Sequence, residues 1–93
     1  MTVEVRLPTL LRPAAGGVAS VTLDGATVGE VLQDLERAHP ALAGQVLTAD
    51  GSLHRFVNVY LNDDDVRYLD KLDTKLGEGD VVSILPAVAG GAS

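Results

Sequence analysis

The sequence predicts an α+β fold in which one main helix packs on a mixed sheet of four to five strands. Two observations predict it: apolar residues recur at helical spacing in one long stretch, and the other apolar stretches are short and broken by turn residues. The expected elements are strands over residues 2–7, 20–23, 56–62, 66–69 and 81–86, a helix over residues 28–38, and a short second helix over residues 41–47. One main helix among several strands fits a two-layer sandwich.

The main helix has a clear start and a clear stop. Thr27 and Glu30 form a capping box, in which the threonine hydroxyl accepts a hydrogen bond from a first-turn N–H and the glutamate reaches back. His39 precedes Pro40, and the helix ends there because a residue before proline avoids the helical conformation. The apolar side chains of this helix fall on one stripe, at Val28, Val31, Leu32, Leu35 and Ala38.

The strands indicate how the sheet is ordered. The first two are expected to pair as an antiparallel hairpin, joined by a long loop over residues 10–17. Residues 50–51 and 62–65 have the composition of turns, and they bound the clearest strand, over residues 56–62. A last strand that lies centrally and parallel to the first would make the arrangement a β-grasp fold.

Composition limits the class of protein. The 93 residues are expected to form one domain over residues 1–86 and a flexible C-terminal tail over residues 87–93. A net charge of −6 repels phosphate backbones and aromatic side chains are scarce, so no nucleic-acid partner is expected. The absence of cysteine excludes disulfides, a thiolate nucleophile and a cysteine zinc site. No apolar run suits a membrane span or a secretory signal, so we expect a cytoplasmic protein without a membrane partner.

Catalytic and metal sites are not expected. Asp63, Asp64 and Asp65 stand together, but a calcium loop needs acids at alternate positions followed by glycine, so a solvated turn is the better interpretation. His39 and His54 have no acidic or cysteine neighbour at ligand spacing, and no serine lies in a nucleophile-elbow motif. We therefore expect no catalytic residue, no metal, no bound cofactor, and a protein that is not an enzyme.

One face of the strand over residues 56–62 predicts a docking surface. Because side chains alternate along a strand, Phe56, Asn58 and Tyr60 are expected to point away from the helix. Exposed apolar surface of this kind often marks a site where a partner docks. The alternative is that long neighbouring side chains cover the two aromatic rings.

The C-terminal run is the most informative feature of the chain. The residues after the last strand are Pro86, Ala87, Val88, Ala89, Gly90 and Gly91. Glycine has no Cβ, so this arm could enter a narrow channel in another protein. Extended at roughly 3.3–3.6 Å per residue, it would reach about 20 Å and could present a carboxylate at Gly91. The alternative is an ordinary frayed terminus.

These features together resemble the ThiS/MoaD sulfur-carrier family of β-grasp, ubiquitin-like proteins. Residues 27–32, 57–63 and 76–91 carry the resemblance, the last with a Gly-Asp turn, a hydrophobic strand and Pro-x-x-x-Gly-Gly. Residues 8–13 and 53–58 further resemble the CysO branch, whose members supply sulfide for cysteine synthesis. The resemblance covers essentially the whole chain.

The resemblance implies a mechanism and a set of partners. An adenylyltransferase similar to the ubiquitin-activating enzymes would use ATP to adenylate the carboxylate of Gly91, and sulfur would displace the adenylate to leave a thiocarboxylate. The implied acceptor is a PLP-dependent cysteine synthase, although a thiosugar, thiamine or molybdopterin pathway remains open. A zinc-dependent JAMM-type metallopeptidase would cut the product at Gly91. Residues 86–90 would enter the sites of these partners.

The sequence departs from the family pattern at its end. Ala92 and Ser93 follow the glycines, so Gly91 has no free carboxylate until they are removed. We expect a native precursor tail that is processed between Gly91 and Ala92; a cloning remnant and an inactive carrier are the alternatives. Two further functions remain open, a ubiquitin-like modifier attached to lysines through Gly91 and a β-grasp adaptor that binds through its sheet.

Overall fold

The computed structural model describes residues 2–86, which form a five-stranded sheet, one α-helix and several short 3-10 helices. The strands are β1 (Thr2–Arg6), β2 (Ser20–Asp24), β3 (Val57–Leu61), β4 (Asp64–Asp65) and β5 (Val81–Pro86), and the α-helix is α1 (Val28–Ala38). The 3-10 helices are η1 (Thr9–Ala15), η2 (Pro40–Leu42), η3 (Val66–Tyr68) and η4 (Lys71–Asp73).

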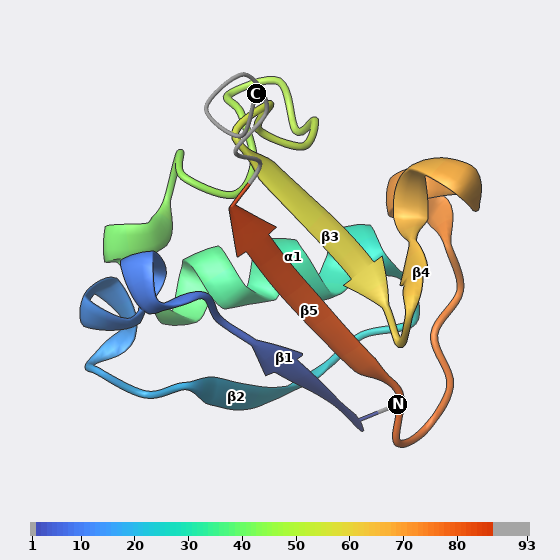
Figure 1. Ribbon diagram of the computed structural model, residues 1–93, viewed down its shortest axis with the longest axis horizontal. Coiled ribbons are helices and arrows are strands. Elements are labelled where there is room, and N and C mark those ends of the chain that lie inside the picture. Colours follow the sequence, from blue (N-terminus) through green and yellow to red (C-terminus); the bar gives the residue numbers. More distant parts are fainter. Residues whose placement is uncertain (1, 87–93) are drawn as a thin grey trace.

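The last strand lies at the centre of the sheet. The strand order is β2-β1-β5-β3-β4, and α1 crosses one face of the sheet, behind it in the view of Figure 1. β5 pairs in parallel with β1, with Val5 opposite Val82, and antiparallel with β3, with Val59 opposite Ile84. β1 and β2 form the predicted antiparallel hairpin. The β-grasp prediction is therefore confirmed.

The start of α1 follows the sequence signals. The N–H of Glu30 donates to Oγ1 of Thr27 at 3.2 Å, as the capping box requires. The Glu30 carboxylate reaches back one residue further than the motif predicts, because it accepts from the N–H of Ala26 at 3.0 Å. Gly29 allows close packing here, since a Cβ would lie 3.1 Å from the carbonyl oxygen of Leu72.

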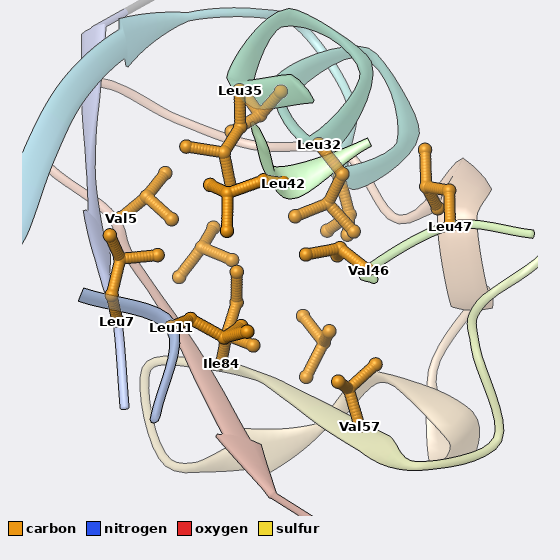
Figure 2. Packing of buried hydrophobic residues seen from close by; sticks show 14 of the residues in the cluster. Val5, Leu7, Leu11, Leu32, Leu35, Leu42, Val46, Leu47, Val57 and Ile84 are labelled. Atoms are coloured by element: carbon orange, nitrogen blue, oxygen red, sulfur yellow. The ribbon is translucent and has the colours of Figure 1, made fainter. Parts of the chain in front are cut away.

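The core lies between α1 and the sheet and is aliphatic, as the scarcity of aromatic residues predicts (Figure 2). Leu32 and Leu35 of α1 are fully buried against Val5 and Ile84 of the central strands. Leu42, Val46 and Leu47 close the end of this core from the segment after α1. β5 is therefore packed on its helix-facing side as well as paired along both of its edges.

The predicted second helix over residues 41–47 is wrong. Only η2 forms there, and the backbone then runs irregularly to Leu47. Gly44 interrupts a helix here with a left-handed φ of 84°, and a carboxylate oxygen of Glu36 accepts from the N–H of Val46 at 3.3 Å and from that of Leu47 at 2.9 Å. Two N–H groups that a helix would have paired internally are thus satisfied by α1.

Two further segments differ from their predictions. The strand expected over residues 66–69 is the 3-10 helix η3, because the Asp65 carboxylate caps it by accepting from the N–H of Arg67 at 2.9 Å. The fourth strand is instead β4, inside the segment predicted as a turn. The loop expected over residues 10–17 contains η1, whose Leu11 and Ala15 are buried.

Candidate functional site

The element that positions the predicted site is β5. Val82 and Ile84 are buried, and Pro86, the last described residue, pairs with Val57 at the end of the sheet. The predicted site residues Ala87, Val88, Ala89, Gly90, Gly91 and Ala92, and with them the tail assigned to residues 87–93, lie outside the described residues. The structure therefore defines the base from which the tail starts.

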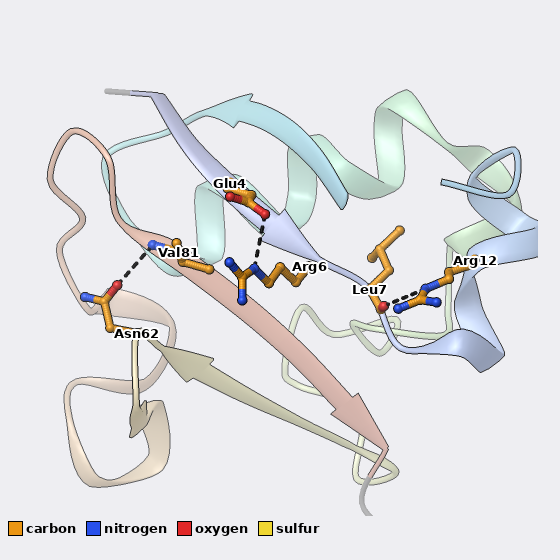
Figure 3. A network of polar contacts seen from close by, with 6 residues as sticks. All are labelled: Glu4, Arg6, Leu7, Arg12, Asn62 and Val81. Atoms are coloured by element: carbon orange, nitrogen blue, oxygen red, sulfur yellow. Dashed lines mark hydrogen bonds and ion pairs between the residues drawn. The ribbon is translucent and has the colours of Figure 1, made fainter. Parts of the chain in front are cut away.

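Side-chain hydrogen bonds hold the start of β5 and the segment that lies beside its end (Figure 3). At the start of β5, Oδ1 of Asn62 accepts from the N–H of Val81 at 3.1 Å, and the Asn62 N–H donates to the carbonyl of Val81 at 2.7 Å. At the other end, Nε of Arg12 donates to the carbonyl of Leu7 at 3.2 Å. This bond holds η1 against the end of β1, beside the base of the tail.

The outer face of the sheet carries two of the predicted docking residues. Val57 and Val59 point into the core, so Asn58 and Tyr60 point outward. On the neighbouring β5, Leu85 lies opposite Asn58 and is 43% exposed. Asn58 is held in place because the Arg67 guanidinium donates to its side-chain oxygen. This outer face is therefore a mixed polar and apolar surface next to Pro86.

Phe56 lies elsewhere than the alternation predicts. It precedes β3, and its N–H donates to Nδ1 of His54 at 3.1 Å. The Arg55 guanidinium lies 5.2 Å from the Phe56 ring centroid, and the His54 ring lies 5.1 Å from it. These neighbours cover the ring only in part, because 60% of Phe56 remains exposed.

A pocket of about 200 Å³ lies beside Phe56, at the end of the sheet where β5 finishes. Its lining includes Pro8, Leu10, Leu11, Phe56, Val57 and Pro86. Sequence reasoning missed Leu10, which is 78% exposed in η1. Two signals were available for it, a pair of leucines in a segment interpreted as a loop and the resemblance of residues 8–13 to the CysO branch.

A shallower groove of the same region carries positive charge. Arg6 and Arg12 line it together with Leu10, Leu85 and Pro86. Arg6 also pairs with Glu4 at 3.1 Å, but both side chains are exposed. The base of the tail is thus surrounded by apolar and basic side chains, although the chain as a whole is acidic.

Of the other candidate groups, His54 lines the pocket beside Pro86. Within residues 2–86, no three His, Asp or Glu side chains are grouped so as to hold a metal ion. His39 follows α1 and its N–H donates to the carbonyl of Leu35 at 2.9 Å. A hydrogen bond from Thr48 is the main cause that lowers the pKa of the Asp50 carboxyl, in an exposed turn. No helix of this part of the chain has the length and apolarity to cross a membrane.

The fold and the site together define a class of protein. A central strand, fixed on both edges and on its inner side, ends beside an exposed surface and leads into a glycine-containing tail. The class is that of small β-grasp proteins, in which the last strand lies centrally in a mixed sheet and one helix packs on one face.

Comparison with known proteins identifies the family. The model of the ThiS family matches residues 5–91, and the chain belongs to this family. The predicted family is therefore confirmed, and with it the prediction that the chain is a non-catalytic carrier and not an enzyme.

Individual relatives show the same relationship. The chain is 48% identical over 93 residues to the sulfur carrier protein CysO of Mycobacterium tuberculosis, covering 98% of this chain and 100% of that one. It is 47% identical over 68 residues to small archaeal modifier protein 3 of Haloferax volcanii, covering 73% of each chain. Among solved structures, a chain of the Amycolatopsis orientalis BexX/CysO complex matches with a TM-score of 0.86 and 46% identity, over 96% of this chain and 99% of that one.

Proposed function

We propose that this protein carries sulfur as a thiocarboxylate on Gly91, after removal of Ala92 and Ser93, and delivers it for cysteine biosynthesis. The observation that carries the proposal is the near full-length similarity to CysO, combined with a Pro-x-x-x-Gly-Gly run that continues directly from the central strand. The proposal also accounts for the absence of cysteine, because the sulfur is held on the chain terminus.

The chemistry requires an activated carboxylate. A carboxylate is a poor electrophile, so a partner adenylyltransferase first joins it to the α-phosphate of ATP and releases pyrophosphate. Sulfide supplied by a sulfur donor then attacks the acyl carbon, AMP leaves, and the thiocarboxylate remains. Because activation consumes ATP, we place the protein in the cytoplasm.

The carrier's own contribution is to hold the base of the tail still while the tip enters another protein. β5 is paired with β1 and β3 and packed by Ile84, so Pro86 is a fixed origin. From there the arm to Gly91 spans about 20 Å at full extension. Gly90 and Gly91 add no side chain, which allows a narrow channel to accept them.

Partner docking is assigned to the surface around the base of the tail. Asn58, Tyr60 and Leu85 present the outer face of the sheet, and Phe56 presents the end of it. Support comes from the exposure of Leu85 and Phe56, since exposed apolar surface marks contact sites. The CysO of Amycolatopsis orientalis crystallised in a complex with BexX, which supports the proposal that this chain also forms complexes with enzymes.

The acceptor and the processing enzyme complete the proposal. The acceptor is a PLP-dependent cysteine synthase, and a JAMM-type metallopeptidase both trims Ala92-Ser93 and releases the product from Gly91. Isotopically labelled sulfur should appear in free cysteine when the loaded carrier, an activated serine, such a synthase and the metallopeptidase are combined. Label that never reaches cysteine in this mixture, but moves from the carrier to a thiosugar, thiamine or molybdopterin precursor, would contradict the cysteine assignment.

The similarity to small archaeal modifier protein 3 favours a second candidate function, that of a protein modifier attached to lysines through Gly91. Activation is the same for both functions, so only the product separates them. A modifier forms conjugates of higher mass that survive reduction, and a carrier does not.

A further inference from the structure

The two edges of the sheet differ in their resistance to pairing with another chain. β4 at one edge has only two residues, Asp64 and Asp65, and a strand this short and this charged offers little to pair with. β2 at the other edge has five residues, from Ser20 to Asp24, that pair with β1 in unbroken register, so no bulge turns the edge away. Its sequence contains no proline, glycine or lysine, and Asp24 is its only charged residue. The edge at β2 is therefore open to a further strand.

The hydrogen-bond phase of the β1-β2 hairpin shows where the backbone groups of β2 point. The N–H of Leu7 donates to the carbonyl of Ala19 at 2.8 Å, and these two residues continue the register of the hairpin. Hydrogen-bonded and non-hydrogen-bonded pairs alternate along an antiparallel ladder. Val21 and Leu23, two and four residues after Ala19, therefore bond to β1. The even-numbered residues of β2 direct their N–H and C=O groups away from it.

Ser20, Thr22 and Asp24 line the outer edge with these backbone groups. Within residues 2–86, no other strand lies beside β2, which forms the margin of the sheet in Figure 1. The three side chains are exposed, whereas Val21 and Leu23 between them are partly buried against the core. The core thus holds β2 extended while a row of N–H and C=O groups points outward, and such a row is a template for strand addition.

A second copy of β2 complements this row. With two copies antiparallel about an axis at Thr22, Ser20 of each lies opposite Asp24 of the other, and the three outward N–H groups of each strand meet the three outward carbonyls of the other. The Ser20 hydroxyl is then placed to donate to the Asp24 carboxylate. A register that set the two Asp24 side chains opposite each other would be disfavoured by like charge. The edge is therefore complementary to itself in the register of greatest overlap.

We propose that two copies of this protein associate through β2 and form one continuous ten-stranded sheet. The two β5 strands then run in opposite directions, separated by five strand spacings of about 4.8 Å, or about 24 Å. Pro86 of each copy therefore lies at the opposite end of the sheet. No residue of β2 lines the pocket or the groove beside Pro86, so association leaves both accessible. The inference does not depend on the proposed function.

The association is expected to be weak. A five-residue edge buries less than the roughly 1,200 Å² of a stable interface. The net charge of −6 on each copy adds repulsion, which salt screens. We therefore expect single copies at about 10 μM and pairs at about 1 mM, with more pairs at high salt.

NMR of the full chain over this concentration range, together with sedimentation, tests the proposal. The N–H signals of Ser20, Thr22 and Asp24 should shift, and their hydrogen exchange should slow, as concentration rises. The N–H groups of Val21 and Leu23 bond to β1 at every concentration, so their exchange is the internal control. The sedimenting mass should rise from one copy toward two over the same range.

Three replacements of one residue separate pairing from folding. Thr22→Pro removes an N–H that points away from β1, a loss that an edge strand tolerates, and it should abolish association. Thr22→Lys keeps the N–H but sets two lysines opposite each other, and it should also abolish association. Thr22→Val keeps the backbone groups and the β-branched shape, and it should still associate. Circular dichroism checks that each variant is folded.

A chain that sediments as a single copy at about 1 mM would overturn the proposal. A folded Thr22→Lys variant that associates as strongly as the parent would do the same. Concentration-dependent signals confined to Leu10 and Phe56 would place self-association at the pocket and contradict the assignment to β2. Protection of the outer N–H groups of β2 that arises only when a different protein is added would show that the second copy is the wrong partner.

Discussion

Replacement of Glu36 tests how the segment after α1 is held. In the Glu36→Ala variant, the N–H groups of Val46 and Leu47 lose the carboxylate oxygen that accepts from them at 3.3 and 2.9 Å. A hydrogen bond to a charged group contributes about 1.5–3 kcal/mol, and partial access of water reduces that value. For the two bonds together we expect a loss of about 2–3 kcal/mol in the free energy of unfolding. For a domain of this size the melting temperature should fall by roughly 10–20 °C.

Two further variants make this measurement specific. Glu36→Gln keeps a side-chain oxygen that can accept, so it should lose only about 1 kcal/mol. Asp34→Ala removes an exposed ion pair with Arg37 on the same helix and should change stability by less than about 0.5 kcal/mol. Urea unfolding followed by circular dichroism measures all three. A Glu36→Ala protein as stable as the parent would refute the role assigned to this carboxylate.

Three other predictions concern a close helix contact, a titration and the tail. Gly29→Ala should not give the gain of about 1 kcal/mol usual for alanine in a helix, since its Cβ would crowd the Leu72 carbonyl; a melting temperature several degrees above the parent would contradict this. By NMR, the Asp50 carboxyl should titrate below its usual pKa of 3.8, and Thr48→Val should raise the midpoint. Because the pKa of Asp50 is lower in the folded state, the hydrogen bond stabilises the folded protein above the ordinary pKa, and this stabilisation is lost as the pH falls through the folded-state pKa. An unchanged midpoint in Thr48→Val would show that the hydrogen bond has no effect on the pKa. Gly90→Ala and Gly91→Ala should impair activation and sulfur transfer at an unchanged melting temperature, whereas a large fall in that temperature would mean that the tail is structural.

The parts of the fold that the sequence predicts correctly depend on local patterns. The capping residue Thr27, the helical stripe of α1 and the alternation of β1 need no information about distant residues, and β5 follows from a single apolar run. The β-grasp order then follows from one decision, to place the last strand centrally and parallel to the first. The structure agrees with that decision in every pairing of the sheet.

The wrong predictions share a physical cause. The segment over residues 41–47 looks helical, but Glu36 satisfies its N–H groups from another element. The segment over residues 66–69 looks extended, but the Asp65 side chain caps a 3-10 turn there. In both cases a polar side chain outside the segment pairs with backbone N–H groups inside it, and in the first case the left-handed Gly44 also interrupts the helix.

The candidate site was predictable in part. The family and the terminal run could be recognised from residue order alone, and Asn58 and Tyr60 follow from strand alternation. Phe56 was placed on the same face, but β3 begins one residue later, so its ring lies at the end of the sheet. Leu10 needed the fold, because the burial of Leu11 and Ala15 and the Arg12 bond to the Leu7 carbonyl place η1 at the end of the sheet, where Leu10 and Pro86 line one pocket.

Intact-mass spectrometry of the chain ending at Gly91 tests the central claim most directly. Incubation with ATP, a sulfur donor and the cognate adenylyltransferase should replace one oxygen of the terminal carboxylate by sulfur, and omission of sulfur should leave the acyl adenylate. The chain that retains Ala92 and Ser93 should give neither product. A carrier ending at Gly91 whose mass never changes, with an adenylyltransferase that activates other carriers of this family, would contradict the account.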